Sequence, residues 1–435
     1  MIRWRRWSGM RLALFLAGSA ILGTGVVTAA EPAPSAADAV VRVGIDAGDV
    51  RGGDHRALQA AVDYIAGLGG GTVHIGPGRY EMRNALTLRD NVRIVGVPGR
   101  TVLVACDGFS TRLATDGDCN QREITVADPA NFRIGDGVAV LDKQSGGGFG
   151  VTTATLTAKL GPNVFRISRP LYFDYLMSQQ ATARLVFPVV GGWQVKHAAV
   201  EGLTIEGNRA KAEPLDGCRG GGIYLFESED VSVRNCTVRG YNGDGISFQV
   251  SQGVTVVGCH LENNAGHGLH PGSGSQRPAV RNNRATGNGR DGMFVCWRVR
   301  HGVFEGNTLQ GNRQSGISIG HKDTDNLFRG NQMLGNESAG ILFRNETEPM
   351  GAHRNRFEKN VVLDNGGDDA TAAAVIIRGE HHDLVFRGNV IGHTKPRSGA
   401  TVGIRASATA KGLTADENDF RNVATPVAVE KKRDK

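Results

Sequence analysis

Residues 279–295 read AVRNNRATGNGRDGMFV, and residues 303–319, which lie 24 positions later, read VFEGNTLQGNRQSGISI. Both stretches contain a short alternating strand, an Asn, a second Asn five residues later, and a Gly that opens a further strand. No part of this unit is long enough to be a helix, and so short a unit cannot bury its apolar face alone. It must stack on copies of itself, which predicts an all-β solenoid.

The unit recurs from about Ala199 to the C-terminus, and its Asn positions form two columns. The first column, as we assign it, contains Asn208, Cys236, Cys259, Asn283, Asn307, Asn331, Asn360, Asn389 and Asn418. The second contains Asn264, Asn288, Asn312, Asn336 and Asn365. Stacked Asn side chains can hydrogen-bond one another and the turn backbone. Parallel strands joined by crossovers of one hand then give a right-handed parallel β-helix. In it Cys236 and Cys259 are stacked neighbours, as thiols or as a disulfide.

The region before the repeat is expected to close the end of the helix. Asp54 to Leu68 is amphipathic, with Leu58, Ala61, Val62, Ile65 and Leu68 on one face and Asp54 as its N-cap. A helix here would cap the solenoid. Residues 107–190 break the repeat and predict extra strands at 123–126, 137–141 and 164–167. The chain therefore divides into a leader (1–30), a cap with the first rungs (31–106), a β-rich insertion (107–190), a repetitive core (191–422) and a polar C-terminal tail (423–435).

Composition and the N-terminus limit the class of protein. The 62 glycines among 435 residues indicate many tight turns. Four arginines precede an apolar run, and Thr28-Ala29-Ala30 supplies a small-residue cleavage site, which predicts an exported protein, periplasmic or secreted, cut near Ala30. Without the leader the formal charge falls from +7 to +3, which disfavours a nucleic-acid binder. We expect no membrane span in the mature protein. Cys106 and Cys119 bracket a polar loop and could pair or stay free.

Several motifs resemble known β-helix families. Gly52-Gly53-Asp54, Gly69-Gly70-Gly71-Thr72-Val73 and Pro77-Gly78-x-Tyr80 look like the opening of pectate-lyase-like proteins. The stretch from Asn288 to Met293, with the repeat after it, resembles the β-helix module of alginate C-5 epimerases. That family carries Tyr-Gly-Phe-Asp-Pro-His where this chain has His-Gly-Leu-His-Pro-Gly (267–272), so its catalytic roles cannot be transferred. Asn242-Gly243-Asp244 and Gly266-His267-Gly268 echo polygalacturonase-like hydrolases, whose paired Asp is missing.

Alternation along the strands predicts an outward stripe of polar side chains over successive rungs. The stripe is rich in cations, and Arg binds carboxylates in a bidentate way, so an anionic polysaccharide is the partner that it suits. Its candidate substrate-binding residues are Arg298, Trp297, His267, Glu346, Arg378 and Gln249.

Proton abstraction beside a uronate carboxylate requires a base, a cation for the carboxylate and an acid for the leaving group. We expect Lys322 to act as base, with a pKa lowered by neighbouring cations, or His270 or His321 to act as base or acid. Arg344 or Arg298 would hold the carboxylate, and Asp323 completes the candidate catalytic set. Some β-helix alginate lyases resemble this arrangement, with a Lys and an Arg on neighbouring rungs.

These observations predict a β-eliminating lyase or a related C-5 epimerase that is monomeric and needs no cofactor. Two alternatives stay open: a glycoside hydrolase using Asp323, Glu346 and Glu380, and a non-catalytic glycan binder or adhesin. Asp323, Asp325 and Asn326 are the one candidate for Ca²⁺ ligands. Asp244, His267 and Asp291, which each precede a strand-opening Gly, fit a turn-stabilising role better than catalysis.

Overall fold

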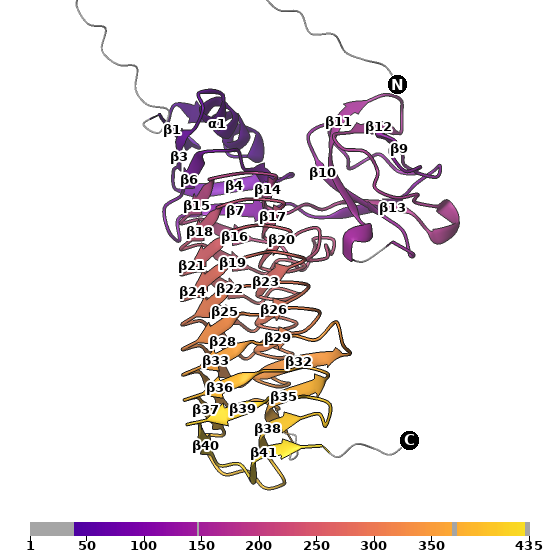
Figure 1. Ribbon diagram of the computed structural model, residues 1–435. Coiled ribbons are helices and arrows are strands. Elements are labelled where there is room, and N and C mark those ends of the chain that lie inside the picture. Colours follow the sequence, from indigo (N-terminus) through magenta and orange to yellow (C-terminus); the bar gives the residue numbers. More distant parts are fainter. Residues whose placement is uncertain (1–38, 146–147, 368–371, 431–435) are drawn as a thin grey trace, which may run out of the picture. The chain divides into compact units, whose positions relative to one another are not determined.

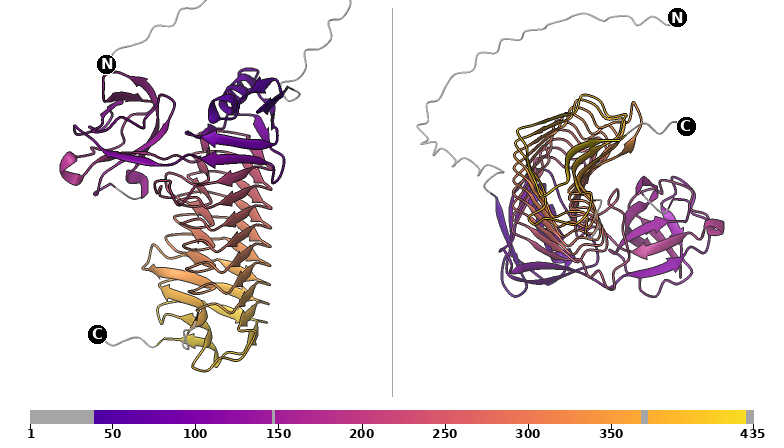
Figure 2. Two further views of the ribbon diagram at one scale, coloured as in Figure 1. Left: turned by 180° about the vertical axis from the view of Figure 1, so that it is seen from behind. Right: turned by 90° about the horizontal axis from the view of Figure 1, so that it is seen from below.

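The computed structural model describes residues 39–145, 148–367 and 372–430. The predicted leader and its cleavage site lie outside these residues. The described chain is a right-handed parallel β-helix that winds through three long parallel sheets, as Figure 1 shows. Each full turn contributes one strand to each sheet, and strands of successive turns superimpose when the stack is viewed along its axis (Figure 2). Among the described residues, no helix has the length and apolar composition needed to cross a membrane.

The first sheet has thirteen strands. In spatial order they are β2 (Val50–Arg51), β1 (Val40–Gly44), β3 (Gly71–Ile75), β6 (Val92–Val95), β15 (Ala199–Glu201), β18 (Ser232–Arg234), β21 (Thr255–Val257), β24 (Ala279–Arg281), β27 (Val303–Glu305), β30 (Leu327–Arg329), β33 (Arg356–Glu358), β36 (Val385–Arg387) and β39 (Thr414–Asp416).

The second sheet has eleven strands. They are β4 (Gly78–Met82), β7 (Thr101–Ala105), β16 (Thr204–Glu206), β19 (Thr237–Arg239), β22 (His260–Glu262), β25 (Arg284–Thr286), β28 (Thr308–Gln310), β31 (Gln332–Leu334), β34 (Val361–Leu363), β37 (Val390–Gly392) and β40 (Asp419–Arg421).

The third sheet also has eleven strands and carries the predicted stripe. They are β5 (Leu86–Thr87), β14 (Val190–Trp193), β17 (Ile223–Phe226), β20 (Ile246–Gln249), β23 (Leu269–Gly272), β26 (Met293–Val295), β29 (Ile317–Ile319), β32 (Ile341–Glu346), β35 (Ala373–Gly379), β38 (Val402–Ala406) and β41 (Thr425–Val429).

The core between the sheets is a stack of identical positions. Four phenylalanines from β27, β30, β33 and β36 lie over one another with ring centroids 4.7, 4.5 and 5.0 Å apart: Phe304, Phe328, Phe357 and Phe386. Each is fully buried. Parallel register therefore turns a repeated apolar residue into a continuous core, which is how so short a unit becomes stable.

The asparagine columns form hydrogen-bonded ladders at two corners. Asn307 shows the pattern: its Oδ1 accepts the backbone N–H of Asn283 at 3.0 Å, and its Nδ2 donates to Asn331 Oδ1 and to Val280 O, both at 2.9 Å. The first ladder runs from Asn283 to Asn418 and the second from Asn264 to Asn365. A third, short ladder joins Asn326 to Asn355.

Our placement of Asn208 in the first column is wrong. Thr204 pairs with Thr237, so Leu203 lies beside Cys236, and Asn208 instead donates to Asp107. The turn between β16 and β17 carries a long loop, which lengthens this repeat and shifted our alignment by five residues. Cys236 and Cys259 are buried as predicted, and all six cysteines, including Cys106 and Cys119, are free thiols.

The cap agrees with the predicted helix except at its end. Helix α1 (His55–Gly67) begins after Asp54, whose carboxylate accepts the N–H groups of Arg56 and Ala57. Leu58, Ala61, Val62 and Ile65 are buried. Leu68 is not part of this face: it is the C-cap residue and is 50% exposed, because the chain leaves the helix there for the glycines that follow.

The insertion forms a six-stranded antiparallel sheet of its own. Its order is β8 (Phe109–Arg112), β13 (Thr182–Leu185), β10 (Gly137–Leu141), β11 (Thr152–Lys159), β12 (Val164–Ile167) and β9 (Glu123–Thr125). Two short 3₁₀ turns, η2 (Gly148–Gly150) and η3 (Met177–Gln179), complete it.

At the C-terminal end of the β-helix, residues 423–430 are not a polar tail, because β41 pairs with β38 and extends the third sheet.

Candidate functional site

The predicted stripe is covered at its N-terminal end. The loop between β16 and β17 crosses the third sheet, where Gly217 O accepts the Ser247 hydroxyl at 2.6 Å and Gln249 Nε2 at 3.3 Å. Gln249 is fully buried and His270 is 5% exposed. The predicted outward stripe is therefore closed over β20 and β23, and Gln249 and His270 do not face solvent.

His270 and His267 belong to a buried network beneath this loop. His270 Nδ1 lies 2.7 Å from Asp244 Oδ2. Burial raises the pKa of Asp244, but the adjacent His267 and His270 more than offset it, so the pKa is lowered overall. Asp244 Oδ1 accepts the N–H of His267, and His267 Nδ1 accepts the N–H of Asp291, one rung further on each time. These side chains thus stabilise the turns that precede the strands.

Phe294 connects that network to a second group of residues. This group, which we call the Arg344 cluster, contains Phe294 itself and the polar residues Cys296, Ser318, His321, Asp323, Arg344 and Glu346. The Phe294 ring stacks on His267 at 4.3 Å, and the Arg344 guanidinium lies 4.6 Å from its centre. Three successive rungs, β26, β29 and β32, bring these residues together on one side of the helix. Of the candidate residues, His321, Asp323, Arg344 and Glu346 therefore lie together, whereas His270 belongs to the buried network beneath the loop.

Arg344 is held inside the cluster. Nη1 donates to Ser318 Oγ at 3.1 Å, and Nη2 donates to Val295 O at 2.9 Å. Nη2 also lies 3.4 Å from Asp323 Oδ2, and the side chain is only 16% exposed. Gly320 makes room for it, because a Cβ at Gly320 would lie 3.0 Å from Arg344 Nε and 2.9 Å from Glu346 Oε1. The guanidinium is thus largely occupied by protein partners.

His321 pairs with Glu346 at the edge of the cluster. Its Nε2 lies 3.1 Å from Glu346 Oε1, and its Nδ1 lies 3.4 Å from Arg344 Nη2. Burial, together with the nearby Arg344 charge, lowers the pKa of His321 to about 4, so the ring is neutral at pH 7. Burial raises the pKa of Glu346. Since Arg344 can only donate, we assign the His321 proton to Nε2, which donates to Glu346. This pair can pass a proton at neutral pH.

The contacts of Asp323 with backbone N–H groups give this side chain a structural role. It is fully buried, and its carboxylate accepts the N–H groups of Val299 at 2.9 Å and Gly320 at 3.2 Å. Burial, only partly offset by Arg344, raises its pKa to about 7. Asp325 is bound to Arg354 and Asn326 to Asn355, so the three candidate Ca²⁺ ligands have separate protein partners and do not converge.

The exposed rim of the cluster carries the groups that a ligand could reach. Trp297 is 42% exposed and stacks on His321 with ring centroids 4.8 Å apart. Arg298 is exposed and Lys322 is half-buried. Among the described residues, neither cation forms an ion pair. Arg378 is exposed on β35, three rungs from β26, and so lies away from this rim.

A separate histidine cluster lies on the next rungs. Glu348 Oε1 is 3.2 Å from His353 Nε2 and 3.4 Å from His382 Nε2. Within the described ranges, these three residues form the one group of His, Cys, Asp and Glu side chains whose geometry could hold a metal ion. We did not predict it. The 29-residue interval from His353 to His382, equal to that from Asn360 to Asn389, was the signal that could have revealed it.

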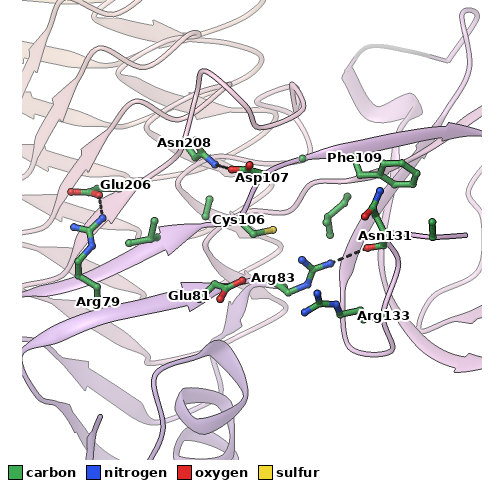
Figure 3. Close-up of a pocket in the computed structure, with 15 residues that line it drawn as sticks. Arg79, Glu81, Arg83, Cys106, Asp107, Phe109, Asn131, Arg133, Glu206 and Asn208 are labelled. Carbon is green, nitrogen blue, oxygen red and sulfur yellow. Dashed lines mark hydrogen bonds and ion pairs between the residues drawn. The ribbon is translucent and has the colours of Figure 1, made fainter. Parts of the chain in front are cut away.

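Two cavities lie away from these clusters. One of about 790 Å³, drawn in Figure 3, is lined by Arg79, Arg83, Arg133, Glu206 and Asn208 among others. Arg79 pairs with Glu206, and Arg83 pairs with Asp136 at 2.8 Å. The other, of about 300 Å³, lies beside Asp244 and Arg290. Sequence reasoning missed the first because its arginines come from β4 and from the insertion.

The comparisons with known proteins bear on this architecture. Residues 201–433, more than half of the chain, match the family model described as periplasmic copper-binding protein (NosD). The chain belongs to the NosD family. Its match covers the repetitive core, including both the Arg344 cluster and the histidine cluster.

Mannuronan C5-epimerases of Azotobacter vinelandii are also similar. A segment of 74 residues is 40% identical to mannuronan C5-epimerase AlgE6, and it covers 15% of this chain and 8% of that protein. The structure of the mannuronan C-5 epimerase AlgE4 A-module matches with a TM-score of 0.55 and 18% identity over 90% of this chain and 98% of the module. The AlgE6 A-module gives 0.53 and 16% over 87% and 96%. At these identities the structural matches show the shared fold.

The description of the NosD family raises the question of whether this chain can hold copper. Copper(II) favours imidazole nitrogens, and Glu348, His353 and His382 offer two of them beside a carboxylate. The donor set therefore fits. Bound there, copper would supply a Lewis-acidic, redox-active cation.

Proposed function

We propose that the protein is a carbohydrate-active enzyme that acts on an acidic polysaccharide by proton abstraction, as a β-eliminating lyase or a C-5 epimerase. The observation that carries the proposal is the neutral His321 paired with Glu346, beside the exposed Trp297 and Arg298 and the half-buried Lys322. The proteins similar in sequence and fold, which are mannuronan C5-epimerases, support the choice of a uronate polymer.

The geometry suggests how the roles are divided. Arg298 and Lys322 have no carboxylate partner among the described residues, so they are the cations that can neutralise a sugar carboxylate. The face of Trp297 suits a sugar ring. Arg344 is instead committed to Asp323, Ser318 and Val295 and acts as a fixed positive charge beside His321.

In the proposed step the Glu346 carboxylate takes the proton from the sugar carbon, while His321 holds that carboxylate in place through its Nε2–H. Water supplies the proton that the leaving oxygen or the opposite ring face takes up. Lys322, beside His321 at the rim, is the alternative base. His270 and Gln249 are buried beneath the loop, so we assign them no direct contact with substrate.

Hydrolysis is the second enzymatic candidate, and the carboxylates argue against it. A glycosidase needs two carboxyl groups that reach the same bond. Asp323 is fully buried with two backbone donors, and Glu380 accepts the N–H of Glu348. Glu346 is therefore the one carboxylate of the three that adjoins the rim.

We also propose that the enzyme is exported, as the leader predicts, and acts as a monomer. The NosD family description as periplasmic supports the compartment. A non-catalytic glycan binder would use the same rim with no chemical role for the His321–Glu346 pair. An activity assay separates such a binder from an enzyme.

The test incubates the protein with a panel of uronate polysaccharides and follows absorbance near 235 nm, new reducing ends and the proton NMR spectrum of the polymer. We expect an absorbance rise for a lyase or an altered NMR spectrum for an epimerase. Either signal should be lost in His321→Gln and reduced in Arg298→Ala and Lys322→Ala.

Matched controls are His301→Gln, Arg313→Ala and Lys359→Ala, which change exposed residues of the same types elsewhere. Reducing ends without absorbance would establish hydrolysis instead. Binding with no chemical change in any assay would leave the glycan binder.

A further inference from the structure

The histidine cluster has a geometry that a simple surface ion pair does not require. His353 and His382 occupy equivalent positions on adjacent rungs, and their rings stack with centroids 3.5 Å apart and planes 13° apart. Both Nε2 atoms face the same oxygen, Glu348 Oε1. The His353 side chain is 9% exposed, that of His382 32% and that of Glu348 51%, so the cluster lies in a shallow position that an ion can reach.

The surrounding contacts fix this arrangement. The backbone N–H of His382 donates to His353 Nδ1 at 3.1 Å, which orients the first ring. The Glu348 backbone N–H donates to Glu380 Oε2 at 2.7 Å, which anchors the carboxylate's loop. The three ligand atoms all lie within 4.8 Å of one another without any change of backbone.

A hydrogen bond behind His382 orients its outer nitrogen toward the cluster. His382 Nδ1 lies 2.8 Å from Asp383 Oδ2, and a carboxylate only accepts, so Nδ1 carries the proton. Nε2 of the same ring then points toward Glu348 and is the nitrogen that a metal ion can reach. A histidine that donates one N–H to a carboxylate while its other nitrogen faces outward is the usual arrangement of a metal ligand.

We propose that His353 Nε2, His382 Nε2 and Glu348 bind one Cu²⁺ ion, with Asp383 as the positioning residue that orients His382. Two imidazoles and one carboxylate suit the imidazole-preferring divalent ions, and among these Cu²⁺ binds most tightly. Binding displaces the proton that His353 Nε2 carries in the metal-free neutral ring. The site lies apart from the Arg344 cluster and does not depend on the proposed function.

The test is a Cu²⁺ titration of tag-free protein by calorimetry, with glycine as competitor to suppress weak surface binding, together with electron paramagnetic resonance of the one-to-one complex. We expect a single tight site, two nitrogen ligands in the spectrum, and weaker binding of Zn²⁺. His382→Gln and Glu348→Gln should abolish the site. Asp383→Asn should weaken it by about 10-fold to 100-fold, as loss of a carboxylate behind a ligating histidine does.

The control is His260→Gln, which removes an exposed histidine on β22 and should leave Cu²⁺ binding unchanged. Melting temperatures with and without Cu²⁺ check the fold, and copper should raise that of the wild type but not that of His382→Gln. Equal Cu²⁺ affinity in wild type and folded His382→Gln, or no tight site in the wild type, would overturn the proposal.

Discussion

His321 shows how neighbours on adjacent rungs set the chemistry of one side chain. It is flanked by Trp297 one turn back and by Arg344 and Glu346 one turn on. Burial and the Arg344 charge disfavour its protonated form, while Glu346 keeps a hydrogen-bond partner for its proton. A histidine in an exposed loop would have none of these constraints.

The lowered pKa of His321 predicts that its ring takes up a proton only at unusually low pH. Because the folded pKa is about 4 against an ordinary 6.5, the neutral ring persists as the pH falls below 6.5 and is lost only as the pH approaches 4. We expect the His321 ring to stay neutral between pH 8 and about pH 5 and to take up a proton below it. An NMR titration of the ring checks this, with His321→Gln to assign its signal, and a midpoint near 6.5 would contradict the environment assigned to His321.

Gly320 predicts a second effect at the residue scale. In Gly320→Ala the new Cβ would lie 2.9 Å from Glu346 Oε1 and 3.0 Å from Arg344 Nε, so both side chains must shift. A displacement of about 1 Å at a catalytic group can cost about 100-fold in rate. We expect kcat/KM to fall by up to that factor while the melting temperature changes little. Gly67→Ala, where a Cβ meets no atom within 4 Å, is the control; equal activity in both variants would contradict the assigned site.

At the scale of elements, the asparagine ladders hold the corners of each turn, while the loop between β16 and β17 decides which rungs are open. The ladders supply partners for backbone groups that the sharp turns leave unpaired. The loop binds Ser247 and Gln249 of β20 through Gly217, while Trp297 and Arg298 on a later rung stay exposed.

The ladders predict a large stability effect from one buried side chain. Asn307→Ala removes the acceptor for Asn283 N–H and the donor to Val280 O, and each orphaned buried group costs roughly 1–3 kcal/mol. We expect the free energy of unfolding to drop by about that amount per group in denaturant titrations. Asn345→Ala, at an exposed position on β32, should be nearly neutral. A neutral Asn307→Ala would mean that the ladder does not contribute to stability.

For the whole molecule, periodicity determined what could be predicted. The recurring Asn and Gly positions give the strands, the sheets and the side of the helix on which His321, Asp323, Arg344 and Glu346 meet, because parallel register maps sequence interval onto space. Where the repeat is interrupted, as at Asn208, the same reasoning failed. The covering of His270 and Gln249 could not be foreseen, since the loop above them has no periodic pattern.

The sequence also could not show which cations are free to bind a ligand and which are paired within the protein. Whether Arg344 or Arg298 is available to a ligand depends on rotamers and on the space above Gly320, which alternation does not encode. The histidine cluster depends likewise on a loop that brings Glu348 to two stacked rings.

The central claim is that an acidic glycan binds across Trp297, Arg298, His321 and Lys322. The most direct measurement is a crystal structure of the protein soaked with an oligouronate of about four sugars. We predict one sugar ring on the face of Trp297 and a sugar carboxylate within hydrogen-bonding distance of Arg298 or Lys322, with a ring carbon close to His321. An oligosaccharide bound instead in the arginine-lined cavity of Figure 3, with this rim empty, would contradict the account.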